Sequence, residues 1–228
     1  MQKGILVYGA GGHAKTVISL LRLLDWDIIG IIDDGVAAGT LVSGVEVLGS
    51  ASLLPELRNQ GVQNVVNAVG GIGNYAIRWN IFKRLRELDF RFPTIIHPSA
   101  FVEDTVTLAD GVQVLAQSYI SSESSVGFGT LINAGVIISH DGKIGQCVNL
   151  SPGALLAGEV TVEDFAQIGM GATINLGVKI GSEARVGNSA VVKSDVPAKG
   201  RVYAGTIWPT VSGKIQPHQP GQQYRKIA

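Results

Sequence analysis

The sequence of 228 residues has one cysteine, Cys147, and few charged or aromatic residues, at 16% and 6% of the chain. A single cysteine excludes an internal disulfide and favours a reducing environment. No apolar run approaches the ~18 residues that span a bilayer, and the start of the chain lacks the features of a signal peptide. We therefore expect a cytoplasmic protein. Eighteen basic residues balance eighteen acidic ones, so no nucleic-acid or membrane partner is indicated.

Glycine and aliphatic residues, in contrast, are abundant. Hydrophobic residues make up 46% of the chain, which is typical of a globular protein and not of a disordered one. The 30 glycines are well above the usual share of about 7%. This excess indicates a fold with many backbone positions that other residues adopt with difficulty.

The first part of the chain, residues 1–93, has the pattern of an α/β domain. Strands that alternate with helices favour a parallel sheet, so we expect a Rossmann-like nucleotide-sugar-binding domain. The expected strands are 5–8, 28–32 and 64–69, and the expected helices are 13–24, 52–60 and 74–88.

Two glycine-rich loops follow strands of this domain. Residues 9–15, Gly-Ala-Gly-Gly-His-Ala-Lys, fit the pattern G-x-G-x-x-A between a strand and a helix, and residues 69–74 form a second cluster. Such glycines let the backbone approach a pyrophosphate, and the helix N-terminus supplies N–H donors. Asp33, which ends the second strand, stands where a ribose-binding acid belongs. The predicted substrate-binding residues are Gly9, Gly11, Gly12, His13, Lys15, Asp33, Asp34, Gly70, Gly71 and Asn74.

These loops allow three interpretations: a purely structural turn, a site for a dinucleotide such as NAD, or a site for a nucleotide-linked substrate. We favour the last. Both loops follow strand ends, so they should open on one crevice, where Lys15 and Arg78 could add positive charge.

The second part of the chain, residues 94–212, has a regular hexapeptide repeat. Seventeen positions from Ile96 to Val192, six apart, are all Ile, Leu or Val, and the fourth residue after each is small or β-branched. A large apolar residue in every hexapeptide fills the interior of a solenoid. The pattern resembles that of the hexapeptide-repeat transferases, which implies a left-handed parallel β-helix with three hexapeptides in each coil. Residues 213–228 are expected to form a C-terminal tail.

The repeats contain one histidine well inside the array, His140, followed by Asp141. A structural histidine in a turn is one interpretation. The other is a general base whose ring is oriented by the carboxylate. With three hexapeptides in a coil, Gly158 should be stacked on His140, where its N–H could act as an oxyanion donor. Asn149 is half a coil away and would meet His140 only across a subunit boundary.

Together, the first glycine loop, the seventeen hexapeptides and residues 138–145 resemble the family of sugar acetyltransferases typified by the N-acetylbacillosamine and GDP-perosamine acetyltransferases and the sialic acid O-acetyltransferases. The resemblance implies a homotrimer, acetyl-CoA between neighbouring β-helices and a nucleotide-linked amino sugar on the first domain. It assigns catalysis to His140, Asp141 and Gly158, and acetyl-CoA binding to Asn149, Ala157, Gly158 and Gly205. The family's second histidine falls on Asn149, and its usual C-terminal motif is present here only as residues 205–209.

N-acetylation of a nucleotide-linked amino sugar, without a metal, is therefore the predicted function. O-acetylation of a sugar hydroxyl would use the same base and remains an alternative. A β-helical carbonic anhydrase needs three histidines around zinc, and only His140, with His97 at the edge, lies in the repeats. A non-enzymatic sugar-nucleotide-binding protein is the alternative from another class.

Overall fold

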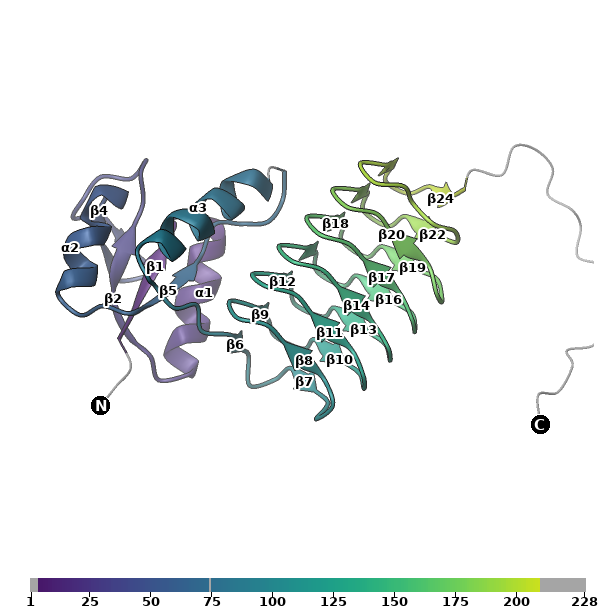
Figure 1. Ribbon diagram of the computed structural model, residues 1–228, viewed down its shortest axis with the longest axis horizontal. Helices are drawn as coiled ribbons and strands as arrows, with labels where there is room; N and C mark the ends of the chain where they lie inside the picture. The colour runs from purple at the N-terminus through teal and green to yellow at the C-terminus, as the bar shows by residue number, and fades with distance from the viewer. Residues whose placement is uncertain (1–3, 74, 210–228) are drawn as a thin grey trace, which may run out of the picture.

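The computed structural model describes residues 4–73 and 75–209, so Asn74 and the expected tail at 213–228 lie outside the described residues. An α/β unit is followed by a long stack of coils that extends away from it (Figure 1). None of the helices in these two ranges has the length and apolar content needed to cross a bilayer.

The N-terminal unit is a five-stranded sheet in the order β3-β4-β2-β1-β5. Its neighbours are parallel except for β3 and β4, which form an antiparallel hairpin that the sequence patterns did not predict. The turn of that hairpin uses positive φ at Ser43 and Gly44. The elements are β1 (Gly4–Tyr8), α1 (Gly12–Leu23), β2 (Asp27–Ile32), β3 (Leu41–Val42), β4 (Val45–Gly49), a 3-10 turn (Ala51–Leu53), α2 (Leu54–Asn59), β5 (Asn64–Asn67) and α3 (Tyr75–Glu87).

Helices cover both faces of this sheet because β1 is apolar on both sides. Ile5 and Val7 pack with the buried side of α1, whereas Leu6 and Tyr8 pack with the α2 and α3 side. A strand that is buried on both faces has a continuous apolar sequence, as residues 5–8 do. The expected Rossmann-like architecture is therefore present.

The second unit is a parallel β-helix with three sheets. The first sheet contains β6 (Ile95–Ile96), β9 (Gln113–Val114), β12 (Leu131–Ile132), β15 (Asn149–Leu150), β18 (Gln167–Ile168), β21 (Arg185–Val186) and β23 (Arg201–Val202). The second sheet contains β7 (Phe101–Val102), β10 (Tyr119–Ile120), β13 (Ile137–Ile138), β16 (Leu155–Leu156), β19 (Thr173–Ile174), β22 (Val191–Val192) and β24 (Ile207–Trp208). The third sheet contains β8 (Thr107–Leu108), β11 (Ser125–Val126), β14 (Lys143–Ile144), β17 (Thr161–Val162) and β20 (Lys179–Ile180).

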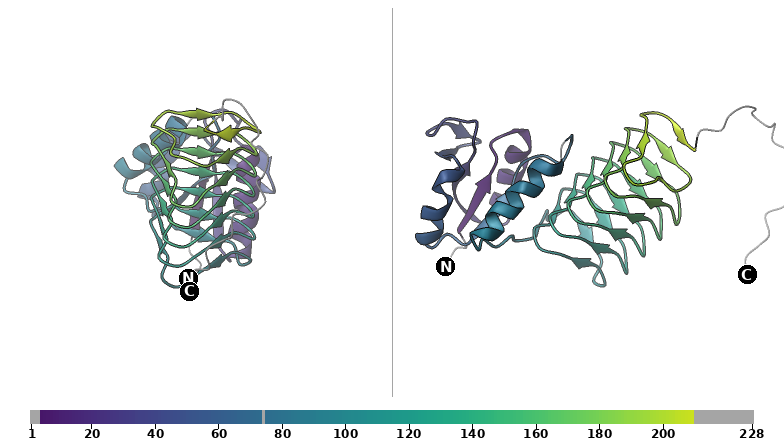
Figure 2. Two further views of the ribbon diagram at one scale, coloured as in Figure 1. Left: turned by 90° about the vertical axis from the view of Figure 1, so that its right-hand side faces the viewer. Right: turned by 45° about the horizontal axis from the view of Figure 1, so that its top comes forward.

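Three hexapeptides make one coil through most of the β-helix. Ile120 pairs with Ile138, and Ile138 pairs with Leu156. The paired residues of neighbouring coils are 18 positions apart in these examples. The large apolar residues of the repeat are buried on one another from Val114 onward, and those of the first coil, Ile96, Val102 and Leu108, are partly buried. Figure 2 shows the backbone of the stacked coils from two further directions. In the last coil Val192 pairs with Trp208, which is 16 positions further on, so this coil is two residues shorter. The β-helix therefore continues past the point where the hexapeptide pattern ends.

Corners of the coils account for seven of the 13 glycines that have positive φ in the described chain. The third residue after a core position has positive φ at corner after corner, as at Asp141, Gly153, Glu159 and Gly177. Glycine takes this conformation at no steric cost, and Asp and Asn tolerate it better than bulky residues do. The sequence repeat is thus a repeat of backbone conformation as well as of apolar side chains.

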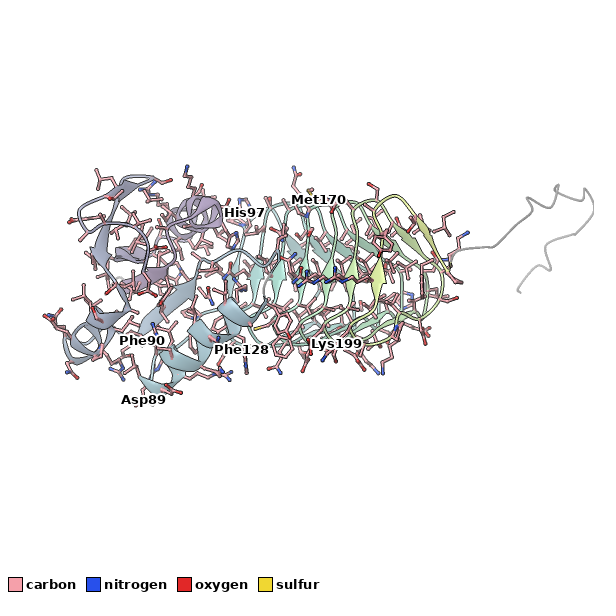
Figure 3. The ribbon with its side chains drawn as sticks, turned by 90° about the horizontal axis from the view of Figure 1, so that it is seen from above. Asp89, Phe90, His97, Phe128, Met170 and Lys199 are labelled. Carbon is pink, nitrogen blue, oxygen red and sulfur yellow. The ribbon has the colours of Figure 1, made fainter. Side chains whose placement is uncertain are left out.

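Aromatic side chains join the two units. The ring of Phe82 on α3 lies 4.7 Å from the ring of Phe128, and the Arg86 guanidinium lies 3.8 Å from the same ring centre. Phe128 packs against α3 in the same chain, at the edge of the β-helix opposite Met170 (Figure 3).

Candidate active site

A corner between the second and third sheets carries His140 and Asp141. The positive φ of Asp141, 58°, turns its carboxylate back toward the preceding residue, and Oδ2 lies 2.8 Å from Nδ1 of His140. Both side chains are about half exposed, at 55% and 54%. When Nδ1 carries the proton and donates to Asp141, Nε2 has a free lone pair that can accept a proton.

Gly158 lies directly on the imidazole, one coil further along. A Cβ atom added there would come within 2.5 Å of both Cε1 and Nε2 of His140. The N–H groups of Ala157 and Glu159 donate to Ile174 and His140 in the ladder. Within residues 4–73 and 75–209, the Gly158 N–H has no such acceptor. Glycine here therefore makes room for the ring and leaves a donor beside it.

The residues that the family resemblance assigned to acetyl-CoA do not lie together in one chain. Ala157 is adjacent to Gly158 at the corner of His140. Gly205, whose N–H donates to Asn188, lies at the corner between the first and second sheets. Asn149 lies on the first sheet, is 3% exposed and is covered by Gly71. Their assignment to acetyl-CoA remains a prediction.

The first glycine loop leaves the N-terminus of α1 open. Gly9 has a φ of +113° and packs against the Val69 backbone, so its role is to make the turn. Cβ atoms at Gly11 and Gly12 would meet none of the described residues within 4 Å. Within the described chain, the helix has no side-chain cap and no acidic residue in its first turn. A helix end of this kind attracts an anion, because its first N–H groups are free and its dipole is positive there.

Asp33 and Asp34 contact backbone and side chains of their own domain. Asp33 accepts hydrogen bonds from the N–H groups of Ala10, at 2.8 Å, and Gly35, at 2.8 Å. It thus holds the glycine loop in place. Asp34 accepts from the Ala51 N–H and from the Tyr8 hydroxyl, each at 2.9 Å. These bonds, the Ala51 bond most of all, lower the pKa of Asp34.

A cavity of about 420 Å³ lies between the glycine loops and the first sheet of the β-helix. Residues from both units line it. They are His13, Gly70, Gly71, Ile72, Leu131, Asn133, Asn149, Pro152 and Met170. His13, Gly70 and Gly71 were predicted to belong to one site, and the structure places all three at this cavity. Asn149 lies there too.

Lys15 and Arg78, the two basic residues expected at this crevice, lie in different surroundings: one is exposed and the other is buried. Lys15 is exposed on α1. Arg78 is 2% exposed, and its guanidinium donates to the carbonyl groups of Asn67, Val69 and Gly129. Burial lowers its pKa to about 10. We expected Arg78 to contribute charge to a ligand. The structure corrects this expectation, because Arg78 instead connects the second glycine loop to the β-helix.

Sequence reasoning missed the contacts that three amide side chains of the first sheet make with the N-terminal unit. One of the three, Asn149, lines the cavity and was expected at acetyl-CoA instead. Gln113, Asn149 and Gln167 occupy the outward first position of strands in the first sheet, and whole coils separate them. Each contacts a loop of the N-terminal unit: Gln113 reaches His13, Asn149 packs on Gly71, and Gln167 accepts from the Gly73 N–H. A column of amides on one face of a solenoid was the available signal.

No group of three or more His, Cys, Asp or Glu side chains that could hold a metal ion occurs among the residues that the structure describes. His97 instead has its Nδ1 within 2.8 Å of the Ser99 hydroxyl.

Comparison with known proteins agrees with this geometry. Residues 4–85 match the model of the PglD N-terminal domain family. The UDP-N-acetylbacillosamine N-acetyltransferase of Bacillus subtilis (strain 168) is 30% identical over 116 residues, which are 50% of this chain and 52% of that protein. The match thus spans about half the length of that curated relative.

Two solved structures match over nearly their whole length. The perosamine N-acetyltransferase of Caulobacter crescentus, solved in complex with CoA and GDP-perosamine, is 36% identical with a TM-score of 0.83, over 89% of this chain and 94% of that one. This chain belongs to the hexapeptide-repeat sugar acetyltransferase family. The acetyltransferase domain of PglB from Neisseria gonorrhoeae, in complex with acetyl coenzyme A, is 29% identical with a TM-score of 0.81, over 90% of this chain and 98% of that one.

Membership of the family confirms three predictions. The fold class is a Rossmann-like domain followed by a left-handed β-helix, the enzyme class is acyltransferase, and the relatives bind CoA or acetyl-CoA. The roles of individual site residues remain predictions.

Proposed function

We propose that this protein transfers the acetyl group of acetyl-CoA to the amine of a nucleotide-linked amino sugar. The observation that carries the proposal is the His140 corner, where an imidazole hydrogen-bonded to a carboxylate lies against a glycine whose N–H has no acceptor in the described chain. Relatives that bind CoA with GDP-perosamine, or acetyl coenzyme A, support the two substrates. No metal takes part in the proposed reaction.

In the proposed mechanism, His140 acts as the general base. Nε2 takes a proton from the sugar amine as the amine attacks the thioester carbonyl. Asp141 holds the Nδ1–H tautomer and stabilises the imidazolium that forms. The negative charge that develops on the carbonyl oxygen is stabilised by the Gly158 N–H. Collapse of the tetrahedral intermediate expels the CoA thiolate, which takes the proton from the imidazolium, and leaves the acetamido sugar with His140 neutral again.

The nucleotide is proposed to bind the N-terminal unit. The open N-terminus of α1 suits its diphosphate, since Gly11 and Gly12 leave space for close approach. The adjoining cavity of about 420 Å³ suits the sugar. Asp33 and Asp34, although bonded within the domain, keep exposed surface at the same sheet edge, and the ribose or base remains their predicted contact.

A homotrimer is the proposed assembly, because one chain does not bring the two sites together. The sugar cavity opens on the first sheet, whereas His140 lies at the corner between the second and third sheets. The second sheet between them is apolar on its outside: Phe101, Ile137 and Leu155 are 39% to 63% exposed. Packing that sheet against another copy would bury the apolar stripe and bring the cavity of one chain toward His140 of the next.

The test is an acetylation assay with the intact protein. Acetyl-CoA is mixed in turn with UDP-, GDP- and dTDP-linked 4-amino sugars, and thiol release and product mass are followed. We expect one nucleotide series to release CoA and to gain an acetyl group that resists mild base, as an amide does. A base-labile product would instead establish O-acetylation. Thioester cleavage no faster than hydrolysis in every mixture, with nucleotide sugars still bound, would establish a binding protein.

A further inference from the structure

His13 is connected to the β-helix by a short chain of hydrogen bonds. Its Nε2 lies 2.9 Å from Oε1 of Gln113, and Nε2 of Gln113 donates to the carbonyl oxygen of Asn67 at 2.8 Å. Gln113 and Asn67 are each 1% exposed, so water does not compete for these bonds. These contacts run from α1, through Gln113 on the first sheet of the β-helix, to β5, the strand that precedes the second glycine loop.

The Asn67 carbonyl fixes the orientation of the Gln113 amide and, through it, the position of the proton on His13. A carbonyl oxygen only accepts, so the Gln113 amide must direct its NH₂ toward Asn67 and its oxygen toward His13. The reversed amide would place two oxygens against each other. Because Oε1 of Gln113 only accepts, Nε2 of His13 must carry the proton. The neutral ring then has its lone pair on Nδ1.

Nδ1 of His13 is accessible from the sugar cavity. His13 lines that cavity beside Gly70 and Gly71. Among the described residues, Nδ1 has no hydrogen-bond partner. In that part of the chain, Arg58 Nε is the one side-chain nitrogen or oxygen that is both fully buried and without a partner, so Nδ1 of His13 is not fully buried. Nδ1 is therefore partly open and able to accept a hydrogen bond from a molecule in the cavity.

We propose that Gln113 holds His13 as its Nε2–H tautomer, so that Nδ1 accepts a hydrogen bond from a hydroxyl or amine of the sugar and does not bind the phosphates. Diphosphate oxygens are acceptors at neutral pH and cannot donate to a lone pair. The proposal rests on the proposed function and makes His13 a determinant of the sugar, and Gln113 a positioning residue. A glycine-rich loop with a histidine would otherwise suggest a phosphate contact.

The electrostatics around the ring agree. Burial lowers the pKa of His13 to about 4, and the positive charge of Arg78 acts in the same direction, against the Gln113 hydrogen bond. The ring is thus neutral at the pH of the cell. A neutral imidazole supplies no charge to a diphosphate, which leaves that task to the N-terminus of α1.

The tautomer is measurable in the free protein by ¹⁵N NMR of histidine-labelled samples, with His13 assigned through a His13→Asn variant. We expect a protonated Nε2 and an unprotonated Nδ1 at pH 7. In Gln113→Glu, the carboxylate beside the ring should give an imidazolium. Gln167→Glu is the matched control, since it changes the same residue type in the same column but contacts Gly73. An Nδ1–H tautomer or an imidazolium in the wild type would overturn the proposal, whatever the substrate.

The ligand contact is tested by calorimetry with GDP, UDP and their 4-amino sugar derivatives. Loss of the acceptor in His13→Leu or Gln113→Glu should weaken sugar-nucleotide binding by about tenfold, the cost of leaving a buried donor unpaired. Binding of bare GDP or UDP should change less than about twofold. Equal losses for both kinds of probe would show a phosphate contact and refute the proposal. A wild type that binds none of the probes refutes the proposed function, and the NMR result then still decides the tautomer.

Discussion

The regions around His13 and His140 use the same side chain in opposite ways. His13 is largely buried between two domains, and its neighbour is a neutral amide, Gln113. His140 is 55% exposed at an outer corner, and its neighbour is a carboxylate, Asp141. The amide fixes the proton on Nε2, whereas the carboxylate accepts a hydrogen bond from Nδ1.

The difference shows that the neighbour, and not the histidine, decides the chemistry. A ring with its lone pair on Nδ1 and a neutral amide behind it can receive a hydrogen bond and hold a ligand. A ring with its lone pair on Nε2 and a carboxylate behind it can accept a proton and tolerate the resulting charge. Under the proposed function, the first ring lies in the domain that binds the nucleotide sugar, and the second lies in the domain that transfers the acetyl group.

The strongest test of this comparison is to remove each ring. His140→Ala should lower kcat by roughly 10²–10⁴, the range typical of a lost general base, while both substrates still bind. His13→Leu, which has no acceptor, should act mainly on KM for the nucleotide sugar. Steady-state kinetics with both substrates varied separates the two. Near-normal kcat in His140→Ala would show that the amine loses its proton before it binds, and the comparison would fail.

A second test moves the His140 ring without removing it. In Gly158→Ala the new Cβ would lie 2.5 Å from Cε1 and Nε2, so the exposed ring must swing away from its position. We expect kcat to fall by about 10², comparable to the loss of an oxyanion donor, with little change in thermal stability. Gly177→Asn is the control, because its corner has a φ of 67° and open space around it. Similar losses in both variants would point to damage of the coil.

The geometry of the corner at His140, the proposed catalytic site, could be predicted because a β-helix is nearly one-dimensional. Once a coil of three hexapeptides is assumed, the neighbour of His140 follows by addition, and the structure places Gly158 there. The same repeat predicted the buried column of every coil up to Val192. It did not predict Trp208, because the last coil is shorter than the others and the pattern has no further repeat to extend.

The sugar cavity could be predicted only in part, because it is made by contacts between distant segments. The glycine loops were visible as local motifs. Gln113 and Asn149 were not, since nothing local distinguishes an amide that packs on a loop from an amide in water. Asn149 was assigned to acetyl-CoA by resemblance, and its burial under Gly71 depends on how α3 packs on the β-helix. The hairpin β3–β4 was missed because β3 has only two residues and Glu46 interrupts the apolar run of β4.

A third test uses the pKa of His13, which is lowered from 6.5 to about 4 by burial. Between these pH values the unfolded chain binds a proton that the folded chain does not, so stability falls as pH drops through this window. At pH 5 the loss relative to pH 7.5 should be about 2 kcal/mol. Urea unfolding of the wild type and His13→Gln at equal protein concentration measures it. An equal loss in His13→Gln would place the cause elsewhere.

The smallest expected effect is that of the carboxylate at His140. Asp141→Asn keeps an acceptor for Nδ1–H and a residue that tolerates a φ of 58°, so the ring should stay in place and lose only the neighbouring charge. Because both side chains are about half exposed, water screens that charge, and kcat should fall by about tenfold, well short of His140→Ala. Glu159→Gln is the matched control: it removes an acid from the equivalent corner position one coil further on, where φ is 60°, and should leave kcat unchanged. A loss in Asp141→Asn as large as that in His140→Ala would mean that the asparagine amide does not keep the Nδ1–H tautomer and that only the carboxylate can hold the proton there.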